Sequence, residues 1–182
     1  GLQYREQLIK DRLMDTDEFM QRLDRDEPYR APGTAVYMTT NTEDIPRSLY
    51  YNFEQNNAVH EQVILLTFKQ ADSPYVENED RYEQEDLENN IHRIIAHYGF
   101  MEKPDVPETM ALVDKHDNGI DIDLDEISYV LGGETLVPAS EIGMAKWKAT
   151  IFAWLNRNAT PATQYFNVPP EHTIEIGTRL KI

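Results

Sequence analysis

The chain has 182 residues, 40% of them hydrophobic, which suits one folded domain with its own core and excludes wholesale disorder. Thirty-three acidic residues against 17 Lys and Arg give a formal net charge of -16, so nucleic acid and anionic membrane surfaces are excluded as favourable partners. The sequence has no cysteine, which excludes disulfides, a thiol nucleophile and a Cys-based zinc site.

The N-terminal segment predicts a helix. Apolar residues within 2–26 recur at an incomplete helical spacing among many charges, and Pro28 and the Pro32-Gly33 pair then end the pattern. We expect residues 1–32 to form a connecting helix and linker, and residues 33–182 to form the globular domain.

A crossover unit follows. Residues 34–39 are β-rich, residues 45–57 have helical spacing opened by Pro46, and residues 63–68 form a continuous apolar run. Strand, helix and strand in this order require a crossover connection. The sequence therefore predicts a parallel pair of strands.

The acidic segment 77–88 is too charged for a core strand. Residues 82–87 and 91–101, separated by a polar turn at 88–90, nevertheless resemble a hairpin. We expect this segment and the hairpin to form a long extension that is mostly exposed to solvent.

The next prediction is a helix. Pro104 and Pro107 flank its start and Gly119 is a plausible stop. Its apolar face is expected to consist of Met110, Leu112 and Val113.

Alternating residues over 120–131 then predict a strand, interrupted by a bulge at Gly132-Gly133 and resumed to Val137. Residues 144–155 give the best helical signal, and residues 173–182 alternate like a terminal strand. Four aromatic residues in this half are expected in the core or in a dimer interface: Trp147, Trp154, Tyr165 and Phe166. The predicted fold class is α/β, a single domain with a mixed β-sheet flanked by helices.

Five segments in order resemble the Kup (KUP/HAK/KT) family of potassium uptake transporters, in the hydrophilic part that follows the membrane helices. They are Arg30–Thr39 (RAPGTAVYMT), Asn56–Leu66 (NNAVHEQVILL), Tyr98–Pro107 (YGFMEKPDVP), Ser128–Pro138 (SYVLGGETLVP) and the terminal Glu175-Ile176-Gly177. One position departs from the family, because Gly133 stands where relatives commonly carry Arg after the Gly of LGRET.

The resemblance implies a soluble cytosolic regulatory or assembly domain of a potassium importer, a probable K+/H+ symporter. It implies a place at the cytoplasmic face of the cell membrane, no enzymatic activity and no cofactor. The expected partners are the protein's own transmembrane domain and a second copy in a homodimer. Ion sites of the family lie in membrane helices, so no ion ligand is predicted in this chain.

An alternative function is a nucleotide-sensing module, since some members of the family are controlled by cyclic di-AMP. The residues chosen for nucleotide binding, on residue type alone, are Arg30, Asn56, Arg93 and Thr135. Gly132-Gly133 lacks the spacing of a phosphate-binding glycine loop, which favours the bulge.

A third hypothesis is a free-standing small hydrolase that uses His60 with Glu61. The H-E-x-x-H zinc motif is incomplete because position 64 is Ile, and the pair is expected to finish a turn between helix and strand. No catalytic residue and no metal ligand is predicted.

Two other motifs are expected to have structural and not ligand-binding roles. Residues 114–125 resemble an EF-hand loop, but His116 and Asp125 stand where stronger calcium ligands are needed, and the segment alternates like a strand. His92 and His97, five residues apart in a strand, are expected on opposite faces as titratable surface or edge groups.

Overall fold

The computed structural model of the protein describes residues 14–40, 42–132 and 173–176. Several predictions fall outside these residues: the strand continuation to Val137, the helix over 144–155, and the placement of Gly133, Thr135 and the aromatic residues Trp147, Trp154, Tyr165 and Phe166.

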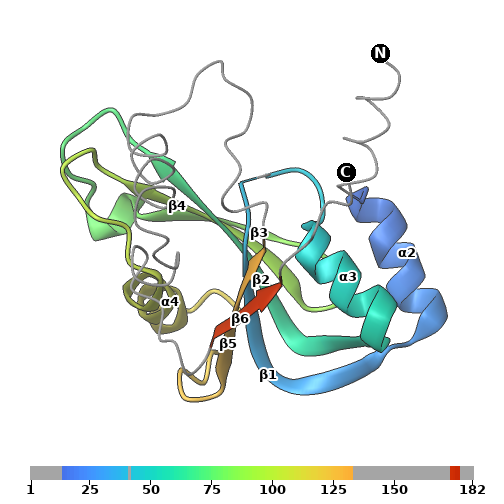
Figure 1. The fold of residues 1–182 in the computed structure, drawn as a ribbon. Coiled ribbons are helices and arrows are strands. Elements are labelled where there is room, and N and C mark those ends of the chain that lie inside the picture. Colours follow the sequence, from blue (N-terminus) through green and yellow to red (C-terminus); the bar gives the residue numbers. More distant parts are fainter. Residues whose placement is uncertain (1–13, 41, 133–172, 177–182) are drawn as a thin grey trace, which may run out of the picture.

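The described residues form a six-stranded mixed sheet in the order β3-β4-β2-β1-β5-β6 (Figure 1). The strands are β1 Tyr29–Met38, β2 Ala58–Gln70, β3 Tyr82–Asp86, β4 Ile91–Tyr98, β5 Ile127–Gly132 and β6 Thr173–Ile176. The helices are α2 Thr16–Asp26, α3 Arg47–Asn56, the short η1 Asn78–Asp80 and α4 Val106–Lys115. Only the β3–β4 pair is antiparallel among the paired strands of the described residues.

This architecture confirms the predicted α/β class. The strand, helix and strand over 34–68 form the predicted parallel pair β1–β2, and residues 82–98 form the predicted hairpin β3–β4. The expectation of a mostly solvated extension is wrong for β4, which is largely buried and also pairs with β2 inside the sheet. The terminal strand is confirmed over Thr173–Ile176. β1 begins at Tyr29, earlier than the expected start at residue 34.

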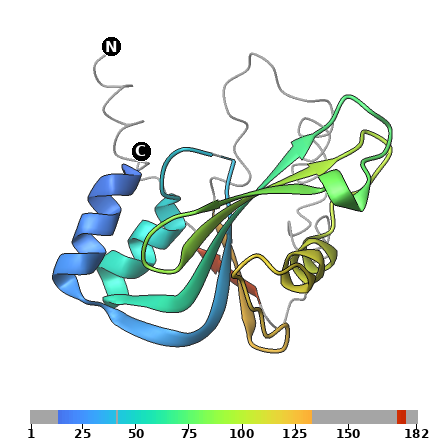
Figure 2. The same ribbon diagram turned by 180° about the vertical axis from the view of Figure 1, so that it is seen from behind.

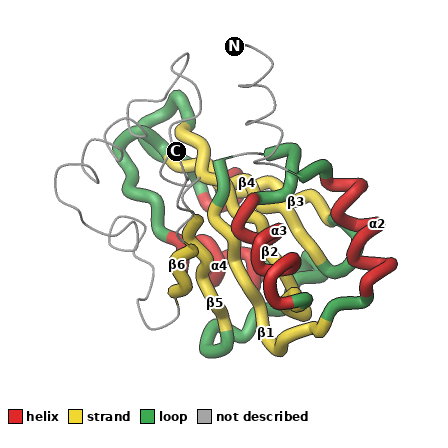
Figure 3. Tube along the Cα trace, turned by 45° about the vertical axis from the view of Figure 1, so that its right-hand side comes forward, coloured by secondary structure: helices red, strands yellow, loops and turns green. Residues whose placement is uncertain are grey.

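Helices α2 and α3 cover one face of the sheet (Figures 1 and 3). Asp15 caps α2 by accepting a hydrogen bond from the Glu18 amide at 3.1 Å. Phe19 from α2 meets Phe53 from α3 edge to face, with 5.6 Å between the ring centroids. Because Phe19 is fully buried, the apolar side of α2 belongs to the core that covers this face.

Helix α4 lies on the opposite face, as the reverse view shows (Figure 2). Asp105 caps it by accepting a hydrogen bond from the Glu108 amide at 2.9 Å. Met110 and Val113 are buried against the strands, as predicted, whereas Leu112 is only half-buried. The helix ends at Lys115, before the stop expected at Gly119.

The strand expected from residue 120 is wrong in its first half, because β5 begins only at Ile127. Side chains satisfy the backbone of the preceding segment: Asn118 Oδ1 accepts from the Ile120 amide at 2.9 Å, and Asp114 Oδ1 accepts from the Ile122 amide at 2.8 Å. Ile120 and Ile122 are buried in the α4-side cluster. Their alternation reflects this packing and not a strand.

The turn expected at His60-Glu61 is also wrong, because both residues lie inside β2. Asn57 makes the turn instead. It adopts the left-handed conformation, with φ 47°, directly after α3, and its carbonyl accepts a hydrogen bond from the Tyr29 amide. One residue is therefore enough to pass from helix to strand.

The structure shows why the RAPGTAVYMT segment has a glycine at position 33. The register of β1 against β2 shifts between Ala31 and Thr34, and Gly33 lies there with φ +90°. A Cβ at this position would lie 2.5 Å from the Glu126 carbonyl oxygen. Any side chain would thus be strained and would collide with the segment that leads into β5.

Candidate functional site

The described residues predicted for nucleotide binding lie on three different elements: Arg30 on β1, Asn56 on α3 and Arg93 on β4. Arg30 pairs with Val59 and Arg93 pairs with Leu65 along the same strand β2. This register separates the two backbones by six residues, or about 20 Å along an extended strand. Thr135 lies outside the described residues.

Arg30 fastens the β3–β4 turn to the sheet. Its Nη2 donates to the carbonyl oxygen of Asn89 at 2.5 Å and lies 3.4 Å from that of Glu61. Burial lowers the pKa of its guanidinium. Asn56, at the end of α3, is exposed and donates to Asn52 Oδ1 at 2.7 Å.

Arg93 is a buried cation, with 2% of its side chain exposed. Its Nη2 donates to the Glu43 carbonyl at 3.2 Å, and its Nε lies 3.6 Å from Glu85 Oε2 on β3. Burial lowers the pKa of the guanidinium. The residue therefore links the edge strand to the loop before α3.

The histidines of β4 also contact the edge strand. His92 Nδ1 lies 2.6 Å from Asp86 Oδ1, and His97 Nε2 lies 3.0 Å from Glu83 Oε2. Along β4, Ile94 lies on the same face as His92, and Ile91 lies on the same face as His97. The two isoleucines belong to different core clusters, so the two histidines point to opposite faces as predicted. The surface location was wrong for His92, which is buried.

The YGFMEKPDVP segment builds the most heavily bonded polar cluster described in the chain. Glu102 forms a two-pronged ion pair with Arg81, with distances of 2.8 and 3.0 Å. The same carboxylate accepts from the amides of Gly99 and Val76 at 2.7 and 3.1 Å. Arg81 also lies under the Tyr98 ring, with Cζ 4.1 Å from the ring centroid.

Sequence reasoning missed this pair, although a signal was present. Arg81 is the one basic residue in the acidic segment 77–88. A lone cation among so many acids points to a specific partner. The partner itself is a carboxylate inside a motif that resembles a family segment.

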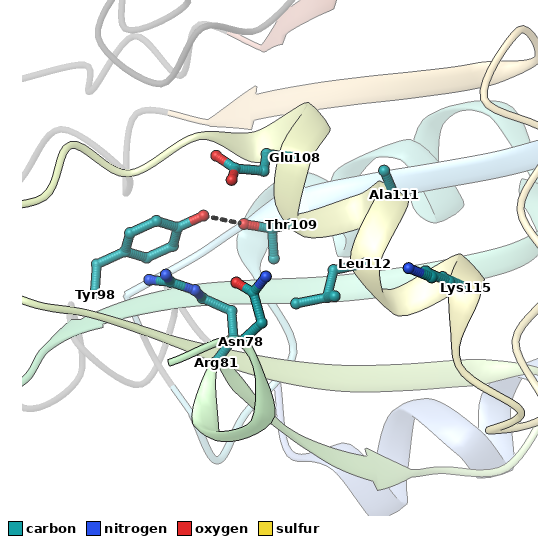
Figure 4. A pocket seen from close by; sticks show the side chains of 8 residues that line it. All are labelled: Asn78, Arg81, Tyr98, Glu108, Thr109, Ala111, Leu112 and Lys115. Atoms are coloured by element: carbon teal, nitrogen blue, oxygen red, sulfur yellow. Dashed lines mark hydrogen bonds between the residues drawn. The ribbon is translucent and has the colours of Figure 1, made fainter. Parts of the chain in front are cut away.

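A small pocket of about 170 Å³ lies beside this cluster, between η1 and α4 (Figure 4). The Tyr98 hydroxyl forms a 2.7 Å hydrogen bond with Thr109 Oγ1 at its wall, and Leu112 and Lys115 line the other end. Ligand pockets usually measure about 300–1,000 Å³. The pocket is therefore too small to enclose a dinucleotide.

The described residues contain neither a metal-binding cluster nor a membrane-spanning helix. Within residues 14–40, 42–132 and 173–176, no group of three or more His, Asp or Glu side chains is arranged to hold a metal ion. Asp114 and Asn118 of the EF-hand-like segment bind backbone amides instead. No helix in the described part of the chain is long and apolar enough to cross a membrane.

The stability of the domain should depend on pH because of the ion pair between Arg81 and Glu102. The hydrogen bonds from Arg81 and the two amides hold the pKa of Glu102 at about 2, below its ordinary value of 4.5. A depressed folded pKa contributes stability that is present above the unfolded value and is lost as the pH falls from about 4.5 towards 2. We expect Glu102→Gln to flatten the acid side of the stability curve, measured by urea unfolding at several pH values. An unchanged acid slope would contradict the assignment.

The comparisons with known proteins concern most of the chain. Residues 32–182 match the family model described as "K+ potassium transporter C-terminal domain". The chain is 41% identical over 155 residues to "Probable potassium transport system protein Kup" of Myxococcus xanthus, covering 85% of this chain and 23% of that protein. It is 35% identical over 165 residues to the protein of the same description from Bordetella avium, covering 91% and 26%.

The match to the protein of that description from Azoarcus sp. reaches 38% identity over 174 residues, 96% of this chain and 27% of the relative. No solved structure matches the chain. The chain thus spans about a quarter of the length of the curated relatives that it matches.

Proposed function

The chain belongs to the K+ potassium transporter C-terminal domain family, and on this premise we propose that it is a cytosolic regulatory or assembly domain of a potassium importer. The observation that carries the proposal is the match of residues 32–182 to that family, with relatives described as potassium transport proteins. The domain acts at the cytoplasmic face of the cell membrane. It modulates uptake of potassium, coupled to protons, by the membrane part.

The charge of the chain supports the proposed location. Cytoplasmic loops of membrane proteins are enriched in Lys and Arg. A domain with a formal charge of -16 is attracted to such a surface. This attraction supports the protein's own transmembrane domain as a partner. The second proposed partner, another copy of the chain in a homodimer, does not follow from the charge.

The placement of His60 and Glu61 favours this role over a hydrolase. They are consecutive residues of β2, so their side chains point to opposite faces of the sheet. Burial also lowers the pKa of the His60 imidazole. A cooperating acid and base at this position would need both side chains on one face.

The contacts of Arg30 and Arg93 argue against the nucleotide-sensing alternative. Arg30 and Arg93 already donate to main-chain carbonyls of the domain. A bound cyclic di-AMP would have to displace these contacts, which favours the regulatory or assembly role without a nucleotide.

Complementation in cells that lack their own potassium uptake systems tests the proposal. The complete reading frame should restore growth at low potassium, and a version without residues 14–182 should restore it poorly or not at all. Immunoblotting of the membranes separates loss of assembly from loss of regulation. Growth that does not respond to the complete reading frame would refute the potassium function. Equal growth and equal membrane abundance with and without the domain would refute the regulatory or assembly role.

A further inference from the structure

Three large apolar side chains are exposed at one end of the sheet. Tyr75 is 65% exposed, Phe100 is 51% exposed and Met101 is 64% exposed. They lie on the connections that follow β2 and β4, at the left-hand end of the sheet in Figure 1. We refer to Tyr75, Phe100 and Met101 as the apolar corner.

The two connections of the apolar corner are fastened together by their backbones. The Phe100 amide donates to the Ser73 carbonyl and the Met101 amide donates to the Pro74 carbonyl, both at 3.0 Å. Gly99 permits this approach, because a Cβ there would overlap the Pro74 carbonyl. The side chains therefore project from a closely packed base.

The Arg81–Glu102 ion pair lies directly behind this base. Glu102 binds the amides of Gly99 and Val76, one from each connection, and Arg81 donates to the Val76 carbonyl at 2.8 Å. An ion pair between the buried Arg81 and the half-buried Glu102 thus holds both loops. This preorganisation lowers the entropy lost when such a surface binds a partner.

The residue types at the apolar corner are those of a binding surface. Aromatic residues and Met are enriched at the centres of protein interfaces, where they bury much area. Isolated exposed apolar residues need no explanation, but these three share one fixed base.

The connection that carries Tyr75 is strongly acidic, and we call its exposed carboxylates the acidic rim. Asp72, Glu77, Glu79 and Asp80 are all exposed on the connection that carries Tyr75. A partner for this surface should offer an apolar site bordered by positive charge.

We propose that the apolar corner docks onto the Lys- and Arg-rich cytoplasmic loops of the transporter's membrane part. This inference rests on the proposed function, and it identifies which surface of the domain faces the membrane part. The basic loops complement the acidic rim, while Tyr75, Phe100 and Met101 supply the apolar contact. Two other occupants fit the charges less well: a second copy would bring two acidic rims together, and anionic lipid would repel the same carboxylates.

The absence of cysteine from the sequence allows a direct test by thiol labelling. Met101→Cys is placed in the complete transporter, with any cysteines elsewhere replaced, and in the separate chain. Leu124→Cys is the matched control, because Leu124 is an exposed apolar residue at the opposite end of the parallel strands, ahead of β5. The rate of reaction with a charged maleimide is then measured for both variants.

We expect the cysteine of the Met101→Cys variant to react about tenfold more slowly in the membrane-embedded transporter than in the separate chain. This ratio corresponds to an apolar corner that is docked, and protected from the reagent, about nine tenths of the time. The Leu124→Cys control should label equally in both settings. High salt should speed labelling of the Met101→Cys transporter by weakening the charge attraction.

Equal rates for Met101→Cys in the transporter and in the separate chain would overturn the inference. Protection in the separate chain that grows with its concentration would assign the surface to a second copy, and protection by protein-free anionic vesicles would assign it to lipid. Either result overturns the proposed occupant. If complementation requires the domain but labelling is equal, the docking surface alone is wrong. If the complete reading frame restores no potassium uptake, the proposed function is wrong.

Discussion

Arg81→Ala is expected to lower the free energy of unfolding by about 2–4 kcal/mol, approaching the loss of about 3–5 kcal/mol that follows removal of one partner of a fully buried ion pair. Only 8% of the Arg81 side chain and 18% of the Glu102 side chain are exposed. Without Arg81, the Glu102 carboxylate would keep only its two amide donors, and the Val76 carbonyl would lose a hydrogen bond. Urea denaturation followed by circular dichroism measures the change.

Arg25→Ala is the matched control for this prediction. Arg25 also forms an ion pair, with Asp26 at 3.0 Å, but 69% of its side chain is exposed. Such exposed pairs contribute little to stability, because water screens them. A loss below about 1 kcal/mol for Arg81→Ala, indistinguishable from the control, would mean that the YGFMEKPDVP segment is not held by this ion pair.

Phe19→Ala is the second large expected effect, with a loss of about 3–5 kcal/mol, typical of truncating a buried phenylalanine. Phe19 is fully buried, and its ring packs edge to face on Phe53. The substitution removes that contact and leaves a cavity between α2 and α3. Urea denaturation of the variant and of the parent chain gives the difference.

Tyr29→Ala serves as the comparison, because Tyr29 is an aromatic residue with 67% exposure. Changes at exposed positions usually stay within about 0.5 kcal/mol. If Phe19→Ala were as mild as Tyr29→Ala, α2 would be a detached connector. The predicted large loss would instead make residues 16–26 part of the folding unit, ahead of the boundary that the sequence suggested at Gly33.

Periodicity predicted the central sheet well because strands buried on both faces have apolar runs and clear stops. The parallel pair β1–β2 follows from one short helix between two such runs, with Pro46 before α3 and Asn57 after it. The hairpin β3–β4 was recognisable from the polar turn at Asn89 and Asn90, which both adopt positive φ.

Alternation misled the prediction where tertiary packing imitates a strand. Ile120 and Ile122 alternate with acids because both pack into the α4-side cluster, while Asp114 and Asn118 satisfy the backbone. Nothing in the local sequence distinguishes this arrangement from a half-buried strand. The distinction depends on side chains that come from the end of α4.

Choosing site residues by type alone gave little information about their partners. Arg30 and Arg93 look available for an anion, but their neighbours Asn89 and Glu43 are distant in sequence and supply carbonyl oxygens. The Arg81–Glu102 pair spans 21 residues and depends on Gly99 allowing two loops to touch. Such pairings follow from strand order, which the sequence does not specify directly.

Transport by the purified protein tests the central claim most directly. The transporter without residues 14–182 is reconstituted into vesicles, and rubidium uptake is compared before and after the separate chain is added to the cytoplasmic side. The proposed function predicts that the truncated transporter carries rubidium at an altered rate and that the added chain restores the rate of the complete protein. Identical uptake by the truncated and complete transporters, unaffected by the added chain, would contradict a role for this domain in potassium transport.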